Sequence, residues 1–397
     1  CSVSKRRLRI RARHQLALHS GIEHASLWKE SRAEHSAVQS CKMAALDATA
    51  VSADANAVSA ELLAACTAGD ATRVRDLLEN GAPASAQDDA SGESALMRAA
   101  STGSAEIVAL LLERGAPWNA LDRKGRCAGE FAVDAQSQAC VDLLVNAGVR
   151  AQLLFGIIEG ASTEDRSSTE YLTTKASFKD KDTLVDDNGD AIMMEWERPL
   201  MAAHADVCVG AFPHDACGYL KDRTDLRVLN VGHGLGIVDG FLRNYAARIS
   251  QHVVIEPHPD VLKRVDSQDW AGVTFRRETW QESLKDETFG PFDAVFFDTY
   301  AERYEDMRDF FRALPRILAP KGVFSFFNGL APFNPFFHGV ACEFVKCELN
   351  EIGLDCAFVP LQVDQSAHDA ETWDGIKRRY WRFDAYHLPI ASHKTLP

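Results

Sequence analysis

The stretch from Arg227 to Glu256 constrains the fold more than any other part of this chain. It reads RVLNVGHGLGIVDGFLRNYAARISQHVVIE. A short apolar run leads into three alternate glycines (Gly232, Gly234 and Gly236), then a helical pattern, then a second apolar run that ends on Glu256. Strand, glycine loop, helix, strand and carboxylate in this order are typical of the first half of a nucleotide-binding crossover unit.

The chain beyond Glu256 continues to alternate strand and helix patterns, which predicts a mostly parallel, doubly wound sheet with helices on both faces. Ligands of such sheets bind at the carboxyl ends of the strands, where Gly232, Glu256 and Asp298 would lie. The expected helices cover residues 258–265, 304–318 and 336–352, and the expected strands cover 273–275, 292–298 and 323–327.

The spacing of the glycines decides between two kinds of nucleotide. A dinucleotide fingerprint needs glycine at the first, third and sixth positions, and the sixth position after Gly232 is Ile237. Glycine at positions one, three and five instead resembles the loop of S-adenosylmethionine-dependent methyltransferases. In that case Glu256 would accept hydrogen bonds from both ribose hydroxyls, because an ionised carboxylate has two acceptor oxygens.

An internal repeat precedes this domain. The segment from Leu77 to Pro83 (LLENGAP) recurs 34 residues later as LLERGAP, and again loosely near Leu143. This period, with small residues in one helix and Leu-Leu in the next, resembles the ankyrin repeat. Gly81 and Gly115 stand where a helix would end with positive φ. The third repeat is degraded, with Cys-Ala-Gly over 127–129 where ankyrin repeats usually have Thr-Pro-Leu. Two roles remain open for it, a docking surface or a scaffold.

Charge and cysteine content limit the class of protein. The net charge is −14, but residues 1–42 hold nine Lys/Arg against three Asp/Glu, so the rest carries −20. An acidic body argues against a nucleic-acid substrate, and no apolar run approaches the roughly 18 residues of a membrane span. Ten cysteines are scattered, and we interpret Cys342, Cys347 and Cys356 as ordinary buried thiols rather than a zinc site. We expect no metal, a reducing compartment and a cytoplasmic or nuclear location.

The basic start of the chain allows two interpretations. It resembles an organelle transit peptide, or it is translated upstream sequence with the true start at Met43. Three glutamates make the second interpretation the better one. We expect residues 1–42 to be disordered in either case.

The segment between the repeats and the glycine loop contains two strand-like pieces joined through Asp187-Asn188-Gly189-Asp190, which predicts a β-hairpin. A calcium loop would need an acid at position 184, where Leu184 stands. Directly after the hairpin, two acids flank a tryptophan in MMEWERPLM. Chemistry alone leaves these acids as either a charged turn or part of a site.

Several motifs together resemble one family. WERPLM, VLNVGHGLGIVDG, VIEPHPDVL, FDAVFFDTY and KGVFSFFNGL are similar to the fungal-type protein arginine δ-N-methyltransferases (type IV), including their ankyrin-like region. They resemble guanidinoacetate N-methyltransferase more distantly. Asn230 fits the arginine enzymes better, whereas His233 stands where a phenylalanine is expected. The resemblance implies an all-α ankyrin-like domain over 43–150, a linker over 151–170 and an α/β, Rossmann-like class I methyltransferase domain over 171–397. Late strands over 356–363 and 379–388 would complete its sheet, one of them antiparallel.

The resemblance also implies roles for individual residues. Glu197 and Asp298 match the two catalytic carboxylates that hold the guanidine group, and Thr299 and Tyr300 would flank the substrate. The guanidinium stays charged and presents five donors in a rigid fork, so paired acids suit it. S-adenosylmethionine would contact these residues: Trp196, Met201, Asn230, Gly232, Gly234, Gly236, Glu256, His258, Thr279, Trp280 and Asp298.

The reaction implied is direct methyl transfer to the internal δ nitrogen of arginine in a protein, with a ribosomal protein as the suggested substrate and a monomer as the expected state. One of the two acids would take the released proton. Two alternatives remain: methylation of free guanidinoacetate, and a non-catalytic ankyrin adaptor with a degenerate methyltransferase domain. The intact glycines and acids speak against the adaptor.

Overall fold

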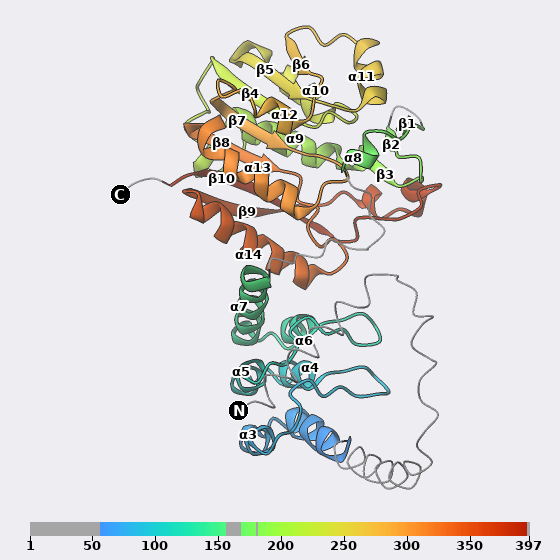
Figure 1. The fold of residues 1–397 in the computed structure, drawn as a ribbon, viewed down its shortest axis with the longest axis vertical. Coiled ribbons are helices and arrows are strands. Elements are labelled where there is room, and N and C mark those ends of the chain that lie inside the picture. Colours follow the sequence, from blue (N-terminus) through green and yellow to red (C-terminus); the bar gives the residue numbers. More distant parts are fainter. Residues whose placement is uncertain (1–55, 156–167, 180–181, 395–397) are drawn as a thin grey trace, which may run out of the picture. The chain divides into compact units, whose positions relative to one another are not determined.

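The computed structural model describes residues 56–155, 168–179 and 182–394. The leader expected over residues 1–42 lies outside the described residues, as does most of the expected linker. From Leu62 onward the chain forms one compact unit, in which a helical repeat region precedes an α/β domain (Figure 1).

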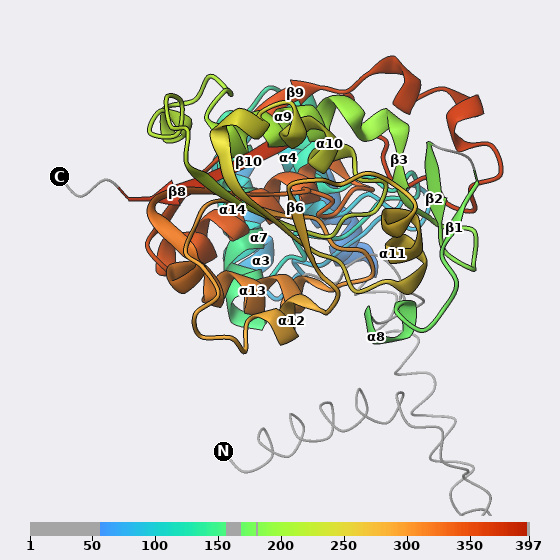
Figure 2. The ribbon, with the colours of Figure 1, turned by 90° about the horizontal axis from the view of Figure 1, so that it is seen from above.

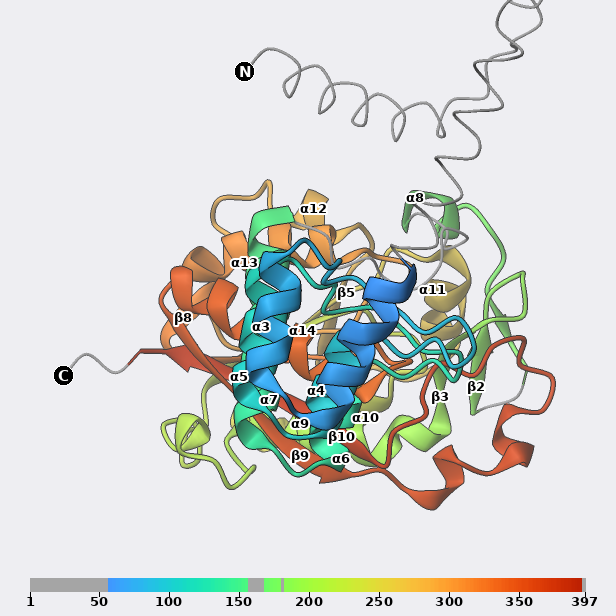
Figure 3. The same cartoon turned by 90° about the horizontal axis from the view of Figure 1, so that it is seen from below.

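The repeat region is a two-layer stack of antiparallel helices. Figures 1 and 3 show α3, α5 and α7 in one layer with α4 and α6 beside them. Asp70, Ser94 and Ser104 cap three of these helices by accepting a backbone N–H in the first turn. Gly81 and Gly115 have φ of 92° and 79°, as their position after a helix predicts. The helices are α3 (Ala71–Glu79), α4 (Ala95–Ser101), α5 (Ala105–Glu113), α6 (Ala128–Asp134) and α7 (Gln138–Phe155).

The third repeat departs from the first two at its end. Helix α7 continues through Gly148 to Phe155 without the turn that follows the earlier Leu-Leu pairs. A Cβ on Gly148 would lie 2.7 Å from Val340 and 3.0 Å from Trp118. This glycine therefore makes room for a close helix contact instead of ending a helix.

The unusual Cys-Ala-Gly of the third repeat has a packing explanation. The ring of Phe336, from the α/β domain, lies where a Cβ of Gly129 would be, only 2.1 Å away. Next to it, Asn334 donates through Nδ2 to Glu130 Oε2 at 2.8 Å. A leucine at position 129 would collide with the ring, so the degraded repeat is the one that packs against the α/β domain.

The α/β domain is built on a seven-stranded sheet of order β6-β5-β4-β7-β8-β10-β9. Strands β6, β5, β4, β7 and β8 are parallel, and β10 runs antiparallel to both of its neighbours. This is the predicted Rossmann-like class with one antiparallel strand. The strands are β4 (Leu226–Val231), β5 (Ile249–Ile255), β6 (Val273–Arg276), β7 (Phe292–Phe297), β8 (Leu318–Phe326), β9 (Leu354–Gln362) and β10 (Ala385–His393).

The expected strand over 379–388 is wrong in its first half, because β10 begins only at Ala385. The aromatic residues before it are buried by a folded loop and not by strand alternation. Trp381 is fully buried there, and its Nε1 donates to the carbonyl of Phe383 at 2.9 Å. Strand β8 also begins earlier than expected, at Leu318.

Helices cover both faces of the sheet, with α9 and α10 on one side and α12 and α13 on the other (Figure 2). Pro199 lies in the first turn of α9, where its fixed φ and missing N–H suit a helix start. The helices are α9 (Arg198–Val209), α10 (Ile237–Arg243), α11 (Pro259–Asp266), α12 (Trp280–Ser283), α13 (Tyr304–Ile317) and α14 (Pro335–Glu351).

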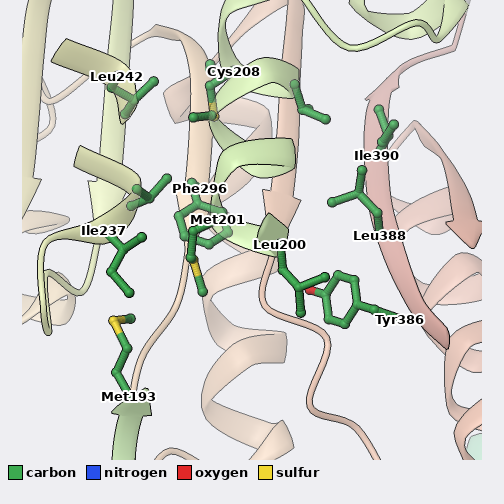
Figure 4. Packing of buried hydrophobic residues seen from close by; sticks show 14 of the residues in the cluster. Met193, Leu200, Met201, Cys208, Ile237, Leu242, Phe296, Tyr386, Leu388 and Ile390 are labelled. Atoms are coloured by element: carbon green, nitrogen blue, oxygen red, sulfur yellow. The ribbon is translucent and has the colours of Figure 1, made fainter. Parts of the chain in front are cut away.

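The core beneath the glycine loop joins α9, α10 and the sheet. Figure 4 shows Met201 and Cys208 of α9 facing Leu242 of α10 and Phe296 of β7. All four side chains are at least nine-tenths buried. This packing fixes the first turn of α9, and with it the Trp-Glu pair just before the helix.

The predicted hairpin is present as a separate small sheet of β1 (Ser177–Phe178), β2 (Thr183–Val185) and β3 (Ala191–Met194). Its turn is closed by Asp186, whose Oδ1 accepts the backbone N–H groups of Asn188 and Asp190 at 2.9 Å each. The acid therefore serves the turn itself.

Candidate active site

The glycine loop follows β4 and passes against the end of β7. Gly232 has φ of 95°, and a Cβ there would lie 1.8 Å from the carbonyl oxygen of Asp298. The two strand ends are also joined by Asp298 N donating to Val231 O at 2.8 Å. Glycine is thus required at position 232 both by conformation and by space.

Glu256, at the end of β5, binds the same loop from the other side. Its Oε2 accepts the N–H of His233 at 2.9 Å and that of Gly234 at 3.4 Å, while Oε1 accepts the N–H of His258 at 2.7 Å. The carboxylate is 5 % exposed. It therefore fixes the loop through the backbone while bordering the cavity described next.

A cavity of about 440 Å³ opens at the carboxyl ends of β4, β5 and β7. This is the edge where the sequence places the ligand. The predicted site residues that line it are Gly232, Gly234, Glu256, Thr279, Trp280, Asp298, Thr299 and Tyr300.

The wall formed by the segment after β6 is held by a carboxylate that was not predicted. Glu302 accepts from Trp280 Nε1 and from Thr299 Oγ1, both at 2.7 Å. Burial raises the pKa of Glu302. Trp280 begins the short helix α12 (Trp280–Ser283), with Thr279 as its N-cap.

Other predicted cofactor residues lie behind the cavity wall. Met201 is in the core and fully buried, and Gly236 is the N-cap of α10. His258 is also fully buried, and its Nε2 has no hydrogen-bond partner among the described residues. Trp196 is 5 % exposed and packs on aromatic rings of the loop before β10. None of these four residues is therefore among those that line the cavity.

Asn230 and His233 support the loop from below. Asp239 of α10 is fully buried and accepts from Asn230 Nδ2 at 2.9 Å, while its two oxygens lie 2.6 Å from His233 Nδ1 and 2.8 Å from His252 Nε2. Burial alone would raise the pKa of Asp239, but the bonds to both histidines outweigh it and lower the pKa. His233, which replaces the expected phenylalanine, thus points into this network.

Glu197 and Asp298 lie close enough for the charge of Asp298 to act on Glu197, although Glu197 is not among the residues that line the cavity. Asp298 follows β7 and lines the cavity, while its Oδ2 is covered and has no hydrogen-bond partner within the described residues. Glu197 precedes α9 and is 3 % exposed. Burial raises the pKa of Asp298 to about 7. Burial and then the charge of Asp298 raise the pKa of Glu197 to about 8.

Sequence reasoning missed Tyr171 and Tyr380. Tyr171, in helix α8 (Ser168–Tyr171), lines the cavity. Its ring packs against those of His258, tilted, and Tyr300, edge-on, at centroid distances of 4.6 Å and 4.9 Å. Tyr380 donates its hydroxyl to Glu197 Oε1. Neither lies in a periodic element or a motif, so the sequence carried no signal for them.

The expectation of three buried thiols is wrong for Cys347, which is exposed, while Cys342 is buried and Cys356 partly so. Its place on the outer face of α14 explains the difference. Among the described residues, no three His, Cys, Asp or Glu side chains gather as metal ligands. Likewise, no helix of the described part is long and apolar enough to cross a membrane.

Comparison with known proteins supports the two kinds of domain. Residues 62–153 match the family model for ankyrin repeats, in three copies, and residues 160–338 match the model for guanidinoacetate N-methyltransferase. A protein arginine N-methyltransferase 2 of Cryptococcus neoformans is 32 % identical over 339 residues, which cover 80 % of this chain and 90 % of the relative. The chain belongs to the protein arginine N-methyltransferase 2 family.

Other relatives in this family are longer. The protein arginine N-methyltransferases 2 of Yarrowia lipolytica and Debaryomyces hansenii are each 36 % identical over 234 and 245 residues. The matches cover 57 % of this chain and 47 % and 55 % of those relatives, so the chain spans about half of their length. Both domains expected from the sequence, ankyrin repeats and a methyltransferase domain, are thereby confirmed.

Proposed function

We propose that this chain methylates the internal δ nitrogen of arginine residues in a protein, with S-adenosylmethionine as methyl donor. The observation that carries the proposal is the pair of buried carboxylates, Glu197 and Asp298, of which Asp298 lines the cavity. The names of the relatives support arginine as the target. Three finer parts of the proposal rest on the family resemblance. They are the choice of the δ nitrogen, a ribosomal protein as substrate, and a location in the cytoplasm or nucleus.

The cavity fits the proposed methyl donor. Its wall contains the carboxylate of Glu256, at the end of β5, and the indole of Trp280. The glycine loop also borders it, and a side chain at Gly232 would collide with the backbone of Asp298. Its volume of about 440 Å³ is in the range of small-molecule sites. When bound, S-adenosylmethionine supplies an already activated methyl group, so the protein mainly has to position and desolvate the arginine.

The two carboxylates suit a guanidinium in charge and in hydrogen bonding. Their raised pKa values mean that the empty pair shares protons near neutral pH. A guanidinium between them supplies the missing positive charge and donors, so both acids ionise when it binds. After methylation the nitrogen must lose a proton, and one of the two carboxylates, ionised by the bound guanidinium, is placed to accept it.

The proposal is tested by incubating the protein with labelled S-adenosylmethionine and an arginine-containing protein extract, with and without ribosomal proteins. Acid hydrolysates should contain labelled δ-N-methylarginine. The variant Asp298→Asn should lose methyl transfer by at least a hundredfold and still bind S-adenosylhomocysteine. Normal turnover by this variant, or hydrolysates without any methylarginine, would refute the assignment.

A small-molecule activity is the second candidate, because the methyltransferase domain matches the guanidinoacetate N-methyltransferase model. It predicts labelled creatine from guanidinoacetate, unaffected by substitutions in the repeat region. Labelled protein without labelled creatine would reject it.

A further inference from the structure

The loop between β9 and β10, residues 363–384, reaches the proposed guanidine site from the far end of the chain. Its base is closed by Val363 N donating to Asp384 O at 2.9 Å. Inside the loop, Trp373 Nε1 donates to the carbonyl of Ala367 at 2.8 Å, and Trp381 is fully buried. The loop is therefore a folded structure with defined side-chain positions.

The side chain at the centre of this loop is Tyr380. Its hydroxyl donates to Oε1 of Glu197. Its ring lies 5.0 Å from the ring of Trp373 and 5.8 Å from that of Trp196, centroid to centroid. Two indoles thus hold the phenol in the orientation that brings its hydroxyl to the carboxylate.

The loop is also tied to the hairpin that borders the cavity. Arg378 donates to both oxygens of Asp190 at 2.9 Å, and Lys377 N donates to Gly189 O at 2.9 Å. In the same turn, Asp186 accepts from the hydroxyl of Tyr300, a cavity residue, at 3.2 Å. A bidentate pair of this kind fixes orientation as well as distance.

The hydrogen bonds of Glu197 are one-sided. Oε1 accepts both the N–H of Met194, at 3.1 Å, and the hydroxyl of Tyr380, which uses its two lone pairs. Oε2 receives no hydrogen bond from any residue that the structure describes. The carboxylate of Asp298 lines the cavity, and its buried Oδ2 has no hydrogen-bond partner within the described residues.

We propose that Tyr380 is a positioning residue that selects the nitrogen to be methylated. Because Oε1 already accepts hydrogen bonds from Met194 and Tyr380, a guanidinium cannot form a two-pronged pair with Glu197 and must bridge Oε2 of Glu197 and the cavity-lining carboxylate of Asp298. This bridging leaves one defined nitrogen outside the pair of carboxylates. The inference rests on the proposed arginine methylation and names the device that makes it regioselective.

The test is the product distribution of Tyr380→Phe, which removes only the hydroxyl. With Oε1 free, the guanidinium can turn to form the two-pronged pair, so terminal-nitrogen methylarginine should rise at least tenfold relative to the δ product. Loss of one hydrogen bond to a charged group should also lower kcat/KM roughly 10- to 100-fold. Arg378→Met, which loosens the loop without altering Tyr380, should change the product ratio in the same direction.

The matched control is Tyr245→Phe, since Tyr245 donates to Asp206 at 2.7 Å in the same domain but away from the cavity. It should leave product ratio and rate as in the wild type. Folding is checked by S-adenosylhomocysteine affinity within threefold of the wild type. If wild-type protein forms methylarginine and both loop variants keep its product ratio, the role of Tyr380 is refuted. If wild-type protein forms none, the proposed function itself fails.

Discussion

Replacing Gly232 by alanine tests the central packing argument of the glycine loop. An L residue at φ of 95° costs about 1–2 kcal/mol. The added Cβ would lie 1.8 Å from the carbonyl oxygen of Asp298, a backbone atom that cannot swing away, and such overpacking costs about 1–3 kcal/mol. The expected loss is therefore about 2–5 kcal/mol in the free energy of unfolding, together with weakened cofactor binding.

Gly240→Ala is the matched control, because Gly240 lies in α10 and a Cβ there meets no heavy atom within 4 Å. This variant should gain about 0.5–1 kcal/mol from helix propensity. For both variants, the free energy of unfolding is measured by urea unfolding with a shared m-value, and cofactor-site binding by calorimetric titration with S-adenosylhomocysteine. If Gly232→Ala is as stable as Gly240→Ala and binds equally well, the close approach of the two strand ends is not what requires glycine.

Three further changes test other parts of the structure. Gly129→Leu restores the usual repeat residue and should lower the free energy of unfolding by about 2–3 kcal/mol, because the side chain would collide with an aromatic ring 2.1 Å away. Its control is Gly339→Ala, whose Cβ would meet nothing within 4 Å and which should change the free energy of unfolding little in the same urea assay. The folded-state pKa of Glu197, about 8, exceeds its unfolded value near 4.5, so the folded protein binds more protons and its stability should fall as pH rises from about 4.5 to 8. Glu197→Gln should flatten that slope, leaving the part due to Asp298; an unchanged slope would contradict the raised pKa. Asp239→Asn should lower stability by about 1–3 kcal/mol, and a thermal melt matching the wild type would show that the buried network is dispensable.

The sequence pattern predicted those site residues that lie close together in the chain. Gly232 and Glu256 could be recognised because strand, turn and strand end follow one another within thirty residues, and their geometry is set by backbone rules. The partnership of Glu197 and Asp298 needed a family resemblance, since no periodicity relates residues a hundred positions apart. The structure adds their shared burial, which is what raises both pKa values.

Long-range contacts explain what the sequence could not predict. Tyr380 meets Glu197 across 183 residues, from a loop whose aromatic residues mimic a strand pattern. The same aromatic residues led to the misplaced start of β10 at 379. Gly129 shows the opposite case, where an apparently degraded repeat is the part adapted to Phe336 of another domain.

The position of β10 has a consequence for how the protein is made. Ala385–His393 pairs with both β8 and β9 in the interior of the sheet, although it is the last strand of the described chain. In a growing chain, one edge of β8 is therefore unpaired and β9 has no neighbour in the sheet until residues 385–393 have been made. An unpaired strand edge is a template for pairing with another chain, so the incomplete sheet exposes the domain to aggregation during synthesis.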